Sequence, residues 1–338
     1  MINSTVLVIG GGKFIGRHLV ARLLSDQYNV TILTRGITPH PFEGLVEWIK
    51  CDRENVDEFK NLLYRRVFDY VIDLISFNAG HSAYAAEFFF GRTSRFVHLS
   101  SAAVYLLNRE RINPLCEEDV PRALDDSPPV SGSMVEYGYH KRAAEIEIEK
   151  AVAEKGFPAV IIRPPVVSGQ YDYTERDYGY IRRIMDGGPI ILPVERSGSH
   201  RHVSVKDLVD AIMLCLESKG AAGKTFNVAS HSILSMPDYL GIIATALDTG
   251  LEIMYMPYET LRDEFGKGFS PFAYAKDFIQ DINRAGSLLG FRPSPSKVWL
   301  KELALYYADE YKGNPPAEYT KRREKEIALA QSAKGGGG

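Results

Sequence analysis

The feature of this sequence that most constrains its fold is a glycine run between a short apolar segment and an amphipathic one. Residues 5–9 (Thr-Val-Leu-Val-Ile) have the composition of a buried strand, and residues 10–12 are all glycine. Over residues 14–24 the apolar side chains recur at helical spacing. Glycine suits a strand-to-helix turn where the backbone approaches a pyrophosphate held at the helix N-terminus. The placement predicts a dinucleotide site, with a purely structural turn as the alternative.

The first half of the chain alternates short β-branched runs with longer amphipathic stretches, which is typical of a parallel sheet covered by helices. Strands are expected at 30–33, 46–49, 69–75, 95–99 and 159–162, and helices at 56–63, between 75 and 95, and at 137–154. Residues 225–228 resemble a strand that returns to this sheet. We therefore predict an α/β fold, a Rossmann-type doubly wound parallel sheet with a smaller mixed α/β C-terminal substrate lobe.

The pattern divides the chain into three parts. Residues 1–167, with the returning strand near 225–228, are expected to form a NAD(P)-binding Rossmann domain. A discontinuous substrate-binding lobe is expected at 168–316, and a charged C-terminal helix or tail at 317–338. Residues 107–134 are rich in Pro, Asp and Ser and are expected to form a long loop, and such loops are usually functional.

Composition excludes several classes of protein. The 338 residues include 40 Lys+Arg and 43 Asp+Glu, so the net charge of −3 argues against a nucleic-acid partner held by bulk positive charge. No apolar run approaches the about 20 residues that span a bilayer, and the N-terminus lacks the basic segment of a secretory signal. We therefore expect a cytoplasmic protein without membrane contact.

Cysteine and histidine spacing argues against metal or disulfide chemistry. Cys51, Cys116 and Cys215 lie far apart, so buried free thiols are expected. The eight histidines have no metal-ligand spacing, and residues 200–202 (His-Arg-His) are expected to form a surface strand. No metal site is predicted.

The residue that follows the second expected strand indicates which dinucleotide is bound. An acid about 20 residues after the glycine turn would hold a ribose 2′-hydroxyl, but Arg35 stands there, after Thr34. A guanidinium can bind a 2′-phosphate through two hydrogen bonds, and Lys13 is expected to reach the same phosphate. We predict NADP, with NAD as the alternative cofactor. The alternative interpretation is that Lys13 and Arg35 are both solvated surface residues.

Tyr137 and Lys141 lie four residues apart and therefore on one face of the expected helix. An ammonium beside a phenol stabilises the phenolate, so such a tyrosine can exchange a proton with a substrate hydroxyl while hydride moves to or from a nicotinamide. Ser100 and Ser101 follow the strand at 95–99, at the sheet edge where ligands bind in open α/β sheets. A hydrogen-bonded turn is the alternative for the serines.

The order of these motifs resembles a known family. The glycine turn, Ser-Ser-x-x-Val-Tyr at 100–105, Tyr-x-x-x-Lys and Arg-Pro-Pro at 163–165 are similar to the extended short-chain dehydrogenase/reductases, the NAD(P)-dependent epimerase/dehydratase family. The segments 202–208 and 284–293 resemble later signatures of that family, so the resemblance covers about residues 5–300. The Gly-Gly-x-Lys-Phe-Ile-Gly turn followed by Thr-Arg-Gly resembles its atypical branch.

The resemblance implies roles for these residues. Ser101 would hydrogen-bond the reacting oxygen, Tyr137 would be the acid/base, and Lys141 would assist it and bind the nicotinamide ribose. Asp52 would meet the adenine, although a strand-end aspartate is also a common turn residue. The expected cofactor-binding residues are Gly10, Gly12, Lys13, Phe14, Ile15, Gly16, Arg35, Asp52, Tyr137, Lys141, Pro164 and Val166. A homodimer formed through the Tyr137 helix would be typical of the family.

Two departures bear on the substrate. Sugar-nucleotide enzymes of the family usually carry an arginine where this chain has His200, and a second arginine is not evident at 278–281. Both count against a nucleotide-diphosphate substrate, although Arg182, Arg183 and Arg201 could bind a diphosphate from other positions. The tyrosines of this stretch suit the faces of sugars or other rings, or else they cover core; they are Tyr171, Tyr173, Tyr178 and Tyr180.

The predicted function is hydride transfer at a secondary alcohol or ketone of a sugar or sugar-like small molecule, as an NAD(P)-dependent oxidoreductase or epimerase. Two alternatives remain at this stage. One is a ketone reductase of a non-sugar metabolite. The other is a non-catalytic member of the fold that senses a dinucleotide or binds RNA.

Overall fold

The computed structural model describes residues 4–108, 110–125, 129–266, 268–315 and 318–335. The chain forms two compact units. Unit 1 comprises Met1–Val167, Val205–Ala229 and Gln280–Pro293, and unit 2 comprises Ser168–Ser204, Ser230–Ile279 and Ser294–Gly338. The chain therefore leaves unit 1 and re-enters it twice.

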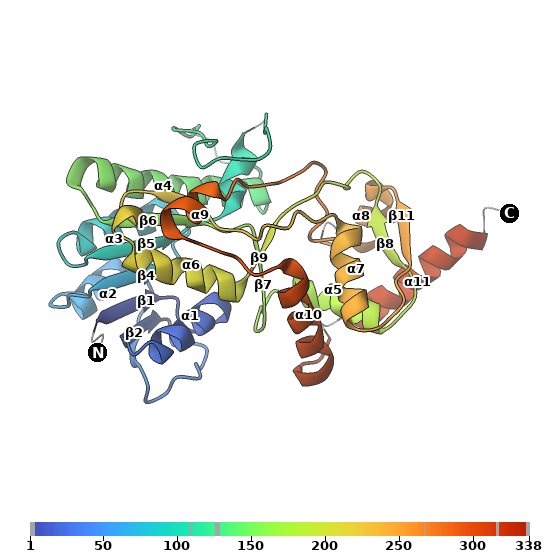
Figure 1. Cartoon of the computed structure of the whole chain (residues 1–338), viewed down its shortest axis with the longest axis horizontal. Helices are drawn as coiled ribbons and strands as arrows, with labels where there is room; N and C mark the ends of the chain where they lie inside the picture. The colour runs from blue at the N-terminus through green and yellow to red at the C-terminus, as the bar shows by residue number, and fades with distance from the viewer. Residues whose placement is uncertain (1–3, 109, 126–128, 267, 316–317, 336–338) are drawn as a thin grey trace. The chain divides into compact units, whose positions relative to one another are not determined.

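Unit 1 is built on a seven-stranded sheet with the order β10-β6-β5-β4-β1-β2-β3, in which every neighbouring pair is parallel (Figure 1). The strands are β1 (Thr5–Ile9), β2 (Asn29–Thr34), β3 (Glu47–Lys50), β4 (Tyr70–Asp73), β5 (Arg95–Leu99), β6 (Ala159–Arg163) and β10 (Thr225–Asn227). This order confirms the predicted doubly wound sheet and its returning strand. The order reverses between β1 and β4, which is where ligands bind in such sheets.

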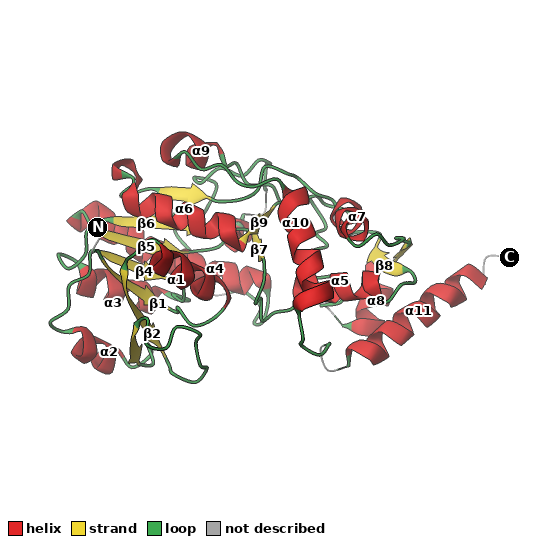
Figure 2. Cartoon of the chain, turned by 60° about the horizontal axis from the view of Figure 1, so that its bottom comes forward, coloured by secondary structure: helices red, strands yellow, loops and turns green. Residues whose placement is uncertain are grey.

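Helices cover both faces of this sheet (Figures 1 and 2). The helical segments of unit 1 are α1 (Phe14–Ser25), α2 (Val56–Leu63), α3 (Ala79–Phe89), η1 (Ala102–Leu107), α4 (Met134–Lys155), α6 (Val205–Glu217), η2 (Lys219–Ala221) and α9 (Asn283–Leu289). Helices α2, α3 and α4 contribute to one hydrophobic cluster on the sheet, while α1 packs against α6. The described residues between η1 and α4 form no helix or extended strand, in agreement with the predicted loop.

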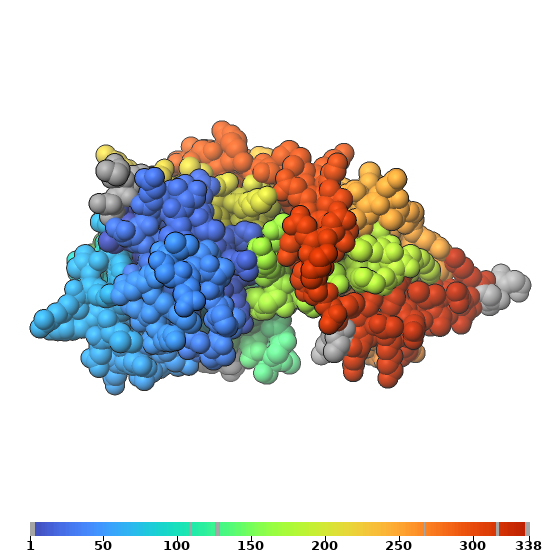
Figure 3. All heavy atoms as spheres, turned by 90° about the horizontal axis from the view of Figure 1, so that it is seen from below, coloured from blue at the N-terminus to red at the C-terminus, as the bar shows by residue number. Residues whose placement is uncertain are grey.

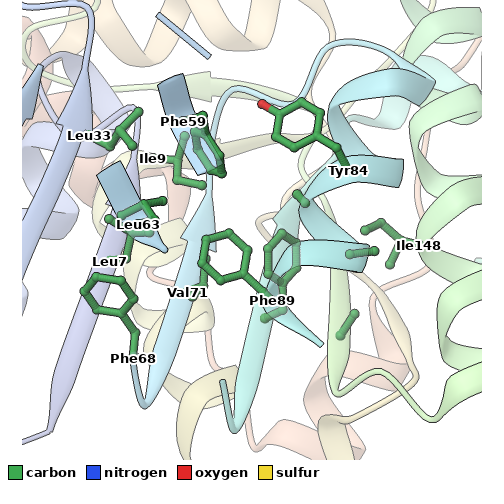
Figure 4. Close-up of a cluster of buried hydrophobic side chains, with 14 of the residues drawn as sticks. Leu7, Ile9, Leu33, Phe59, Leu63, Phe68, Val71, Tyr84, Phe89 and Ile148 are labelled. Carbon is green, nitrogen blue, oxygen red and sulfur yellow. The ribbon is translucent and has the colours of Figure 1, made fainter. Parts of the chain in front are cut away.

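The cluster under α2, α3 and α4 forms the core on that face (Figure 4). Leu7, Ile9 and Val71 enter it from alternate strand positions, and Phe59 and Phe89 close it from the helices. The alternation continues to Asp73 on β4 and His98 on β5, which are paired in register. The apolar layer thus gives way to buried polar groups at the carboxyl end of the sheet.

Unit 2 is a smaller mixed lobe. Its elements are α5 (Arg176–Met185), β8 (Ile190–Pro193), α7 (Met236–Ala246), β11 (Ile253–Met256), α8 (Tyr258–Phe265), α10 (Ser296–Leu305), η3 (Tyr306–Glu310) and α11 (Tyr319–Gly335), with β7 (Val166–Ser168) and β9 (His202–Ser204) at its boundaries. Strands β8 and β11 pair in parallel. Ile191, Met256, Leu261 and Ala330 form a core that includes α11.

The charged C-terminal helix predicted at 317–338 is present as α11, and residues 316–317 and 336–338 lie outside the described residues. Among the described residues, no helix has the length and apolar character required to span a membrane.

Candidate active site

The glycine turn joins β1 to α1, and three of its glycines are sterically required. Gly10 has a φ of +100°, and a Cβ there would lie 2.7 Å from Cγ2 of Ile75. A Cβ on Gly16 would lie 2.3 Å from the Gly10 carbonyl oxygen, so the first turn of α1 rests on the backbone of the turn. A Cβ on Gly11 would lie 2.8 Å from Cγ2 of Ile32, a constraint that the sequence did not reveal.

Gly12 differs from these three, because a Cβ there would meet only Cγ2 of Thr34 at 3.7 Å. Helix α1 has no side-chain cap and no acidic residue in its first turn, and its N-cap is Lys13. Phe14 is buried with a φ of +32°, and Ile15 is half-buried. Open space over Gly12 beside the N-terminus of α1 fits a dinucleotide pyrophosphate.

Exposed cations lie around the ends of the neighbouring strands. Lys13 is exposed, and so is Arg35, which directly follows β2. Lys50 ends β3, and its Cδ lies 3.0 Å from the position of a Cβ on Gly36. Its ammonium sits 4.4 Å from the Trp48 ring centroid. The amino-acid sequence did not identify Lys50 as one of these cations, because its proximity to Arg35 follows from the pairing register of β2 and β3.

Asp52 is exposed and makes the hydrogen bonds of a turn residue. Its Oδ1 accepts from the N–H of Glu54 at 3.1 Å, and its carbonyl accepts from the N–H of Asn55 at 3.0 Å. These bonds fit the turn alternative, and contact between Asp52 and an adenine stays a prediction.

Lys141 is deeply buried, with 1% of its surface exposed. Its ammonium donates to the carbonyls of Ser76 at 2.8 Å and Leu99 at 2.6 Å, at the carboxyl ends of β4 and β5. Burial lowers the pKa of Lys141 to about 8, although Asp73 and Glu145 oppose this effect. The ammonium is therefore held in one place and is still charged at neutral pH.

Gly138 brings the Tyr137 segment of α4 against the serine segment. A Cβ on Gly138 would lie 2.2 Å from the carbonyl oxygen of Ala103, so any side chain would push α4 away from η1. Ser101 is the N-cap of η1, and its Oγ accepts from the Ala103 N–H at 3.1 Å. Tyr137 is 36% exposed. The structure therefore packs the elements carrying Ser101, Tyr137 and Lys141 together in unit 1.

Neutral and paired polar groups lie beneath Lys141. Burial opposes ionisation of Asp73, but Arg53, whose Nη1 lies 2.7 Å from Asp73 Oδ1, outweighs it and lowers the pKa of that carboxyl. Burial and the charge of Lys141 lower the pKa of His98 to about 3. The imidazole of His98 is thus neutral, so it places no second positive charge near the Lys141 ammonium.

The Arg-Pro-Pro segment anchors α4 to the sheet. Arg163 is 1% exposed and binds both oxygens of Glu145 on α4, with Nε–Oε1 and Nη2–Oε2 distances of 2.7 Å. The Pro164 carbonyl accepts from the N–H of Ala102 at 2.8 Å, which places it beside the serine segment. Val166 is half-buried at the start of β7.

Two predictions about surface position are wrong. His200 and His202 do not form a surface strand; they are 0% and 1% exposed, and their Nε2 atoms lie 2.7 Å apart. The surrounding aromatic rings, which are distant in sequence, bury them. Cys116 is exposed rather than buried, whereas Cys51 and Cys215 are buried as expected.

Comparisons with known proteins agree with this arrangement. The model of the NAD dependent epimerase/dehydratase family matches residues 6–90 and 86–229. The chloroplast stem-loop binding protein of 41 kDa b from Arabidopsis thaliana is 26% identical over 305 residues, which are 86% of this chain and 75% of that protein.

Solved structures share the fold at low sequence identity. UDP-N-acetylglucosamine 4-epimerase from Methanobrevibacter ruminantium M1 matches with a TM-score of 0.72 and 21% identity, over 92% of this chain and 100% of that one. UDP-glucuronic acid 4-epimerase from Bacillus cereus, in complex with NAD, matches with a TM-score of 0.71 and 20% identity, over 91% and 100%. Because the family model covers more than half of the sequence, this chain belongs to the NAD dependent epimerase/dehydratase family and is an NAD(P)-dependent enzyme of the extended short-chain dehydrogenase/reductase type.

Proposed function

We propose that this enzyme transfers hydride between NADP and a secondary alcohol or ketone of a sugar or sugar-like substrate, with Tyr137 as acid/base. The observation that carries the proposal is the fixed position of Lys141. Its buried ammonium is tied to the carbonyls at the ends of β4 and β5, one helical turn beyond Tyr137. A lysine with only a structural role is rarely buried without a directly bonded carboxylate.

Each of these side chains has a separate role in the proposed hydride transfer. The bound nicotinamide supplies the hydride acceptor or donor. Tyr137 exchanges a proton with the substrate oxygen, and the Lys141 charge stabilises its phenolate form. Ser101 accepts from the Ala103 N–H, which orients its hydroxyl so that its own proton can be donated to the substrate oxygen. Gly138 keeps these groups together by letting α4 lie on η1.

The preference for NADP rests on the cations at the ends of β2 and β3. No carboxylate follows β2 to hold a ribose 2′-hydroxyl; Thr34, Arg35 and Gly36 stand there instead. Arg35 is exposed, and the alkyl chain of Lys50 packs against Gly36. A 2′-phosphate would gain charge-assisted hydrogen bonds from this pair, with Lys13 at the start of α1 as a third cation.

The substrate is proposed to be a sugar or sugar-like molecule without a nucleotide diphosphate. The two solved structures named above are UDP-sugar epimerases, which favours a sugar. His200 replaces the arginine usual in such enzymes and is fully buried. The alternative arginines are engaged within the protein: Arg182 with Asp186, Arg183 with Glu326, and Arg201 with the carbonyls of Ser230 and His231.

The direct test is Tyr137→Phe, assayed with free sugars, UDP-sugars and simple ketones while NADPH absorbance is followed. The variant should lose about 10²–10⁴-fold in rate and keep its affinity for NADPH, because only the proton-transfer group is removed. Stoichiometric NADPH consumption would identify a reductase, and product formation with unchanged NADPH an epimerase. Tyr139→Phe is the control, since Tyr139 lies on the same helix as Tyr137 and its hydroxyl donates to the Asp125 carbonyl in the preceding loop. Equal rates for both variants would overturn the proposed role.

The cofactor preference is tested separately by Arg35→Ala. NADPH should bind about 10–100-fold more weakly, as expected for lost hydrogen bonds to a charged group, while NADH affinity stays unchanged. Fluorescence titration with both dinucleotides measures this. Arg65→Ala removes an exposed cation that follows α2 and should alter neither affinity. An equal loss for NADH and NADPH would contradict 2′-phosphate recognition.

The relation to a stem-loop binding protein supports a second candidate, the binding of an RNA stem-loop. The two functions separate cleanly in the Tyr137→Phe variant, which should keep RNA binding and lose turnover. A wild-type protein that binds a stem-loop RNA tightly and turns over none of the compounds would favour this second candidate. The homodimer expected through α4 also stays a prediction, measurable by sedimentation.

A further inference from the structure

Unit 2 contains a cavity of about 300 Å³ that the proposed reaction does not use. It lies between α5, the segment 268–271 and α11, and every lining residue belongs to unit 2. The residues that line its wall include Arg176, Gly179, Tyr180, Arg183, Arg322 and Arg323. The glycine turn and the Tyr137 helix, by contrast, belong to unit 1.

The cavity wall carries an excess of positive charge. Four arginines line it, against the two carboxylates of Glu175 and Glu326. Glu326 is shared by two of the arginines, with Arg183 Nε at 3.0 Å and Arg323 Nη1 at 2.6 Å. Glu175 accepts from the hydroxyl of Tyr311 at 3.0 Å. Arg176 Nη2 also lies 3.9 Å from Asp172 Oδ2, so three carboxylates stand against four arginines and one positive charge is left for an anion to neutralise.

One buried donor on the wall lacks a partner. Arg323 Nε has no hydrogen-bond partner among the described residues, although the Arg323 side chain is only 5% exposed. The other nitrogens of Arg323 donate to backbone carbonyls, including that of Pro189 at 2.8 Å. Unpaired buried donors cost free energy in a folded protein, and a bound acceptor would remove that cost.

A glycine keeps the α5 side of the cavity open. Gly179 lies in the middle of α5, where glycine is less favourable than alanine. A Cβ on Gly179 would meet nothing within 4 Å, so no close packing requires the glycine. Gly16 and Gly138, which lie in α1 and α4, have backbone atoms within 2.3 Å of such a Cβ. Gly179 thus leaves the α5 side of the cavity open.

We propose that this cavity binds a small organic anion bearing a phosphate group. The guanidinium of the exposed Arg322 can donate to phosphate oxygens, and the volume is at the lower end of the about 300–1,000 Å³ usual for small-molecule sites. Arg183 stacks on Phe269, with its Cζ 4.9 Å from the ring centroid, so the wall also offers an apolar surface. The red atoms of α11 form part of the molecular surface in Figure 3, and α11 carries the exposed Arg322.

The experiment uses the full chain saturated with NADP, so that the dinucleotide site is filled. Ribose 5-phosphate and inorganic pyrophosphate are added at ionic strength matched with KCl, and Tm and the rate of tryptic cleavage in α11 are measured. Cleavage should slow, because the ligand links α11, which carries Lys321, Arg322 and Arg323, to α5. Tm should rise by a few degrees.

Gly179→Leu fills the cavity and should abolish both effects. Gly241→Leu is the matched control, because a Cβ in the middle of α7 also meets nothing within 4 Å, and it should retain both effects. Arg322→Ala, at an exposed position, should weaken binding of ribose 5-phosphate about tenfold. This variant tests the proposal on its own if Gly179→Leu does not fold. Effects that persist in both variants, or no effect of either compound on the wild-type protein, would overturn the proposal.

Discussion

The two units each bury a polar network, and they stabilise it in opposite ways. In the paired network of unit 1, the Glu145 carboxylate is 0% exposed and binds Arg163 through two bonds of 2.7 Å. Arg142 adds a third bond at 2.9 Å and also binds Glu149. Burial would raise the pKa of Glu145, but Arg163 and Arg142 outweigh it and lower the pKa to about 2.

In the histidine network of unit 2, no cation among the described residues is hydrogen-bonded to the carboxylate of Asp177. Asp177 Oδ1 accepts from Tyr239 at 2.6 Å and from Ser168 at 3.1 Å. The Ser168 hydroxyl lies 3.0 Å from His202 Nδ1, and His202 Nε2 lies 2.7 Å from His200 Nε2. Burial raises the pKa of Asp177 to about 6, and it lowers the pKa of His200 to about 4.

Equal burial therefore leads to opposite protonation, because a carboxylate ionises in a protein interior only when cations replace its lost hydration. The paired network is charged at every ordinary pH and fixes α4, which carries Tyr137 and Lys141. The histidine network approaches neutrality between about pH 4 and pH 6, where Asp177 is protonated and His200 is not. Two substitutions test this contrast.

The larger effect is expected for Glu145→Gln. The change leaves Arg163 charged, buried and without its carboxylate, and removing one partner of a buried pair costs about 3–5 kcal/mol. Urea unfolding at pH 7 measures the loss.

Glu149→Gln is the matched control for that substitution. Glu149 also binds Arg142 but its side chain is 41% exposed, so its loss should cost under about 1 kcal/mol. Similar costs for the two substitutions would show that the buried pair does not hold α4 in place.

A smaller, pH-dependent effect is expected for Asp177→Asn. The Asp177 pKa rises from 3.8 unfolded to about 6 folded, so the folded state binds the extra proton between these values. Wild-type stability gains this contribution below about pH 4 and loses it as the pH rises through 6. Asparagine keeps the accepting oxygen and does not titrate. The variant should match the wild type near pH 4 and exceed it by on the order of 3 kcal/mol at pH 7.5.

Measuring the difference between the two proteins isolates Asp177, because both contain His200 and His202, whose lowered pKa values act in the opposite direction. Unfolding free energies from pH 4 to pH 8 supply this difference. Asp263→Asn, at an exposed position, gives the background. A difference that stays constant across the range would contradict the raised pKa of Asp177.

Much of the architecture was predictable because its signals are local. The strand–glycine–helix order at the N-terminus, the run of parallel strands and the returning strand at 225–227 were all predicted and are confirmed. Helix α4 begins at Met134, three residues before the predicted start, because Ser133 caps it by accepting from the N–H of Glu136 at 3.0 Å. Such a cap is itself a local signal that the apolar pattern did not include.

Other features depended on segments distant in sequence. Lys50 came near Arg35 only through the pairing of β2 with β3. His200 and His202 were predicted on the surface, but Phe272 and Tyr274 pack against them. The cavity in unit 2 required α5 and α11, whose residues are more than 130 positions apart.

The fold class, the glycine turn and the spacing of Tyr137 and Lys141 follow from the amino-acid sequence, since periodicity and turn sterics belong to short segments. Tertiary structure alone decided which ionisable groups are buried and which are paired. Lys141 meets the carbonyls of Ser76 and Leu99, which are 65 and 42 residues away. Charge state depends on solvent exclusion and on such distant partners, and only the packed chain brings them together.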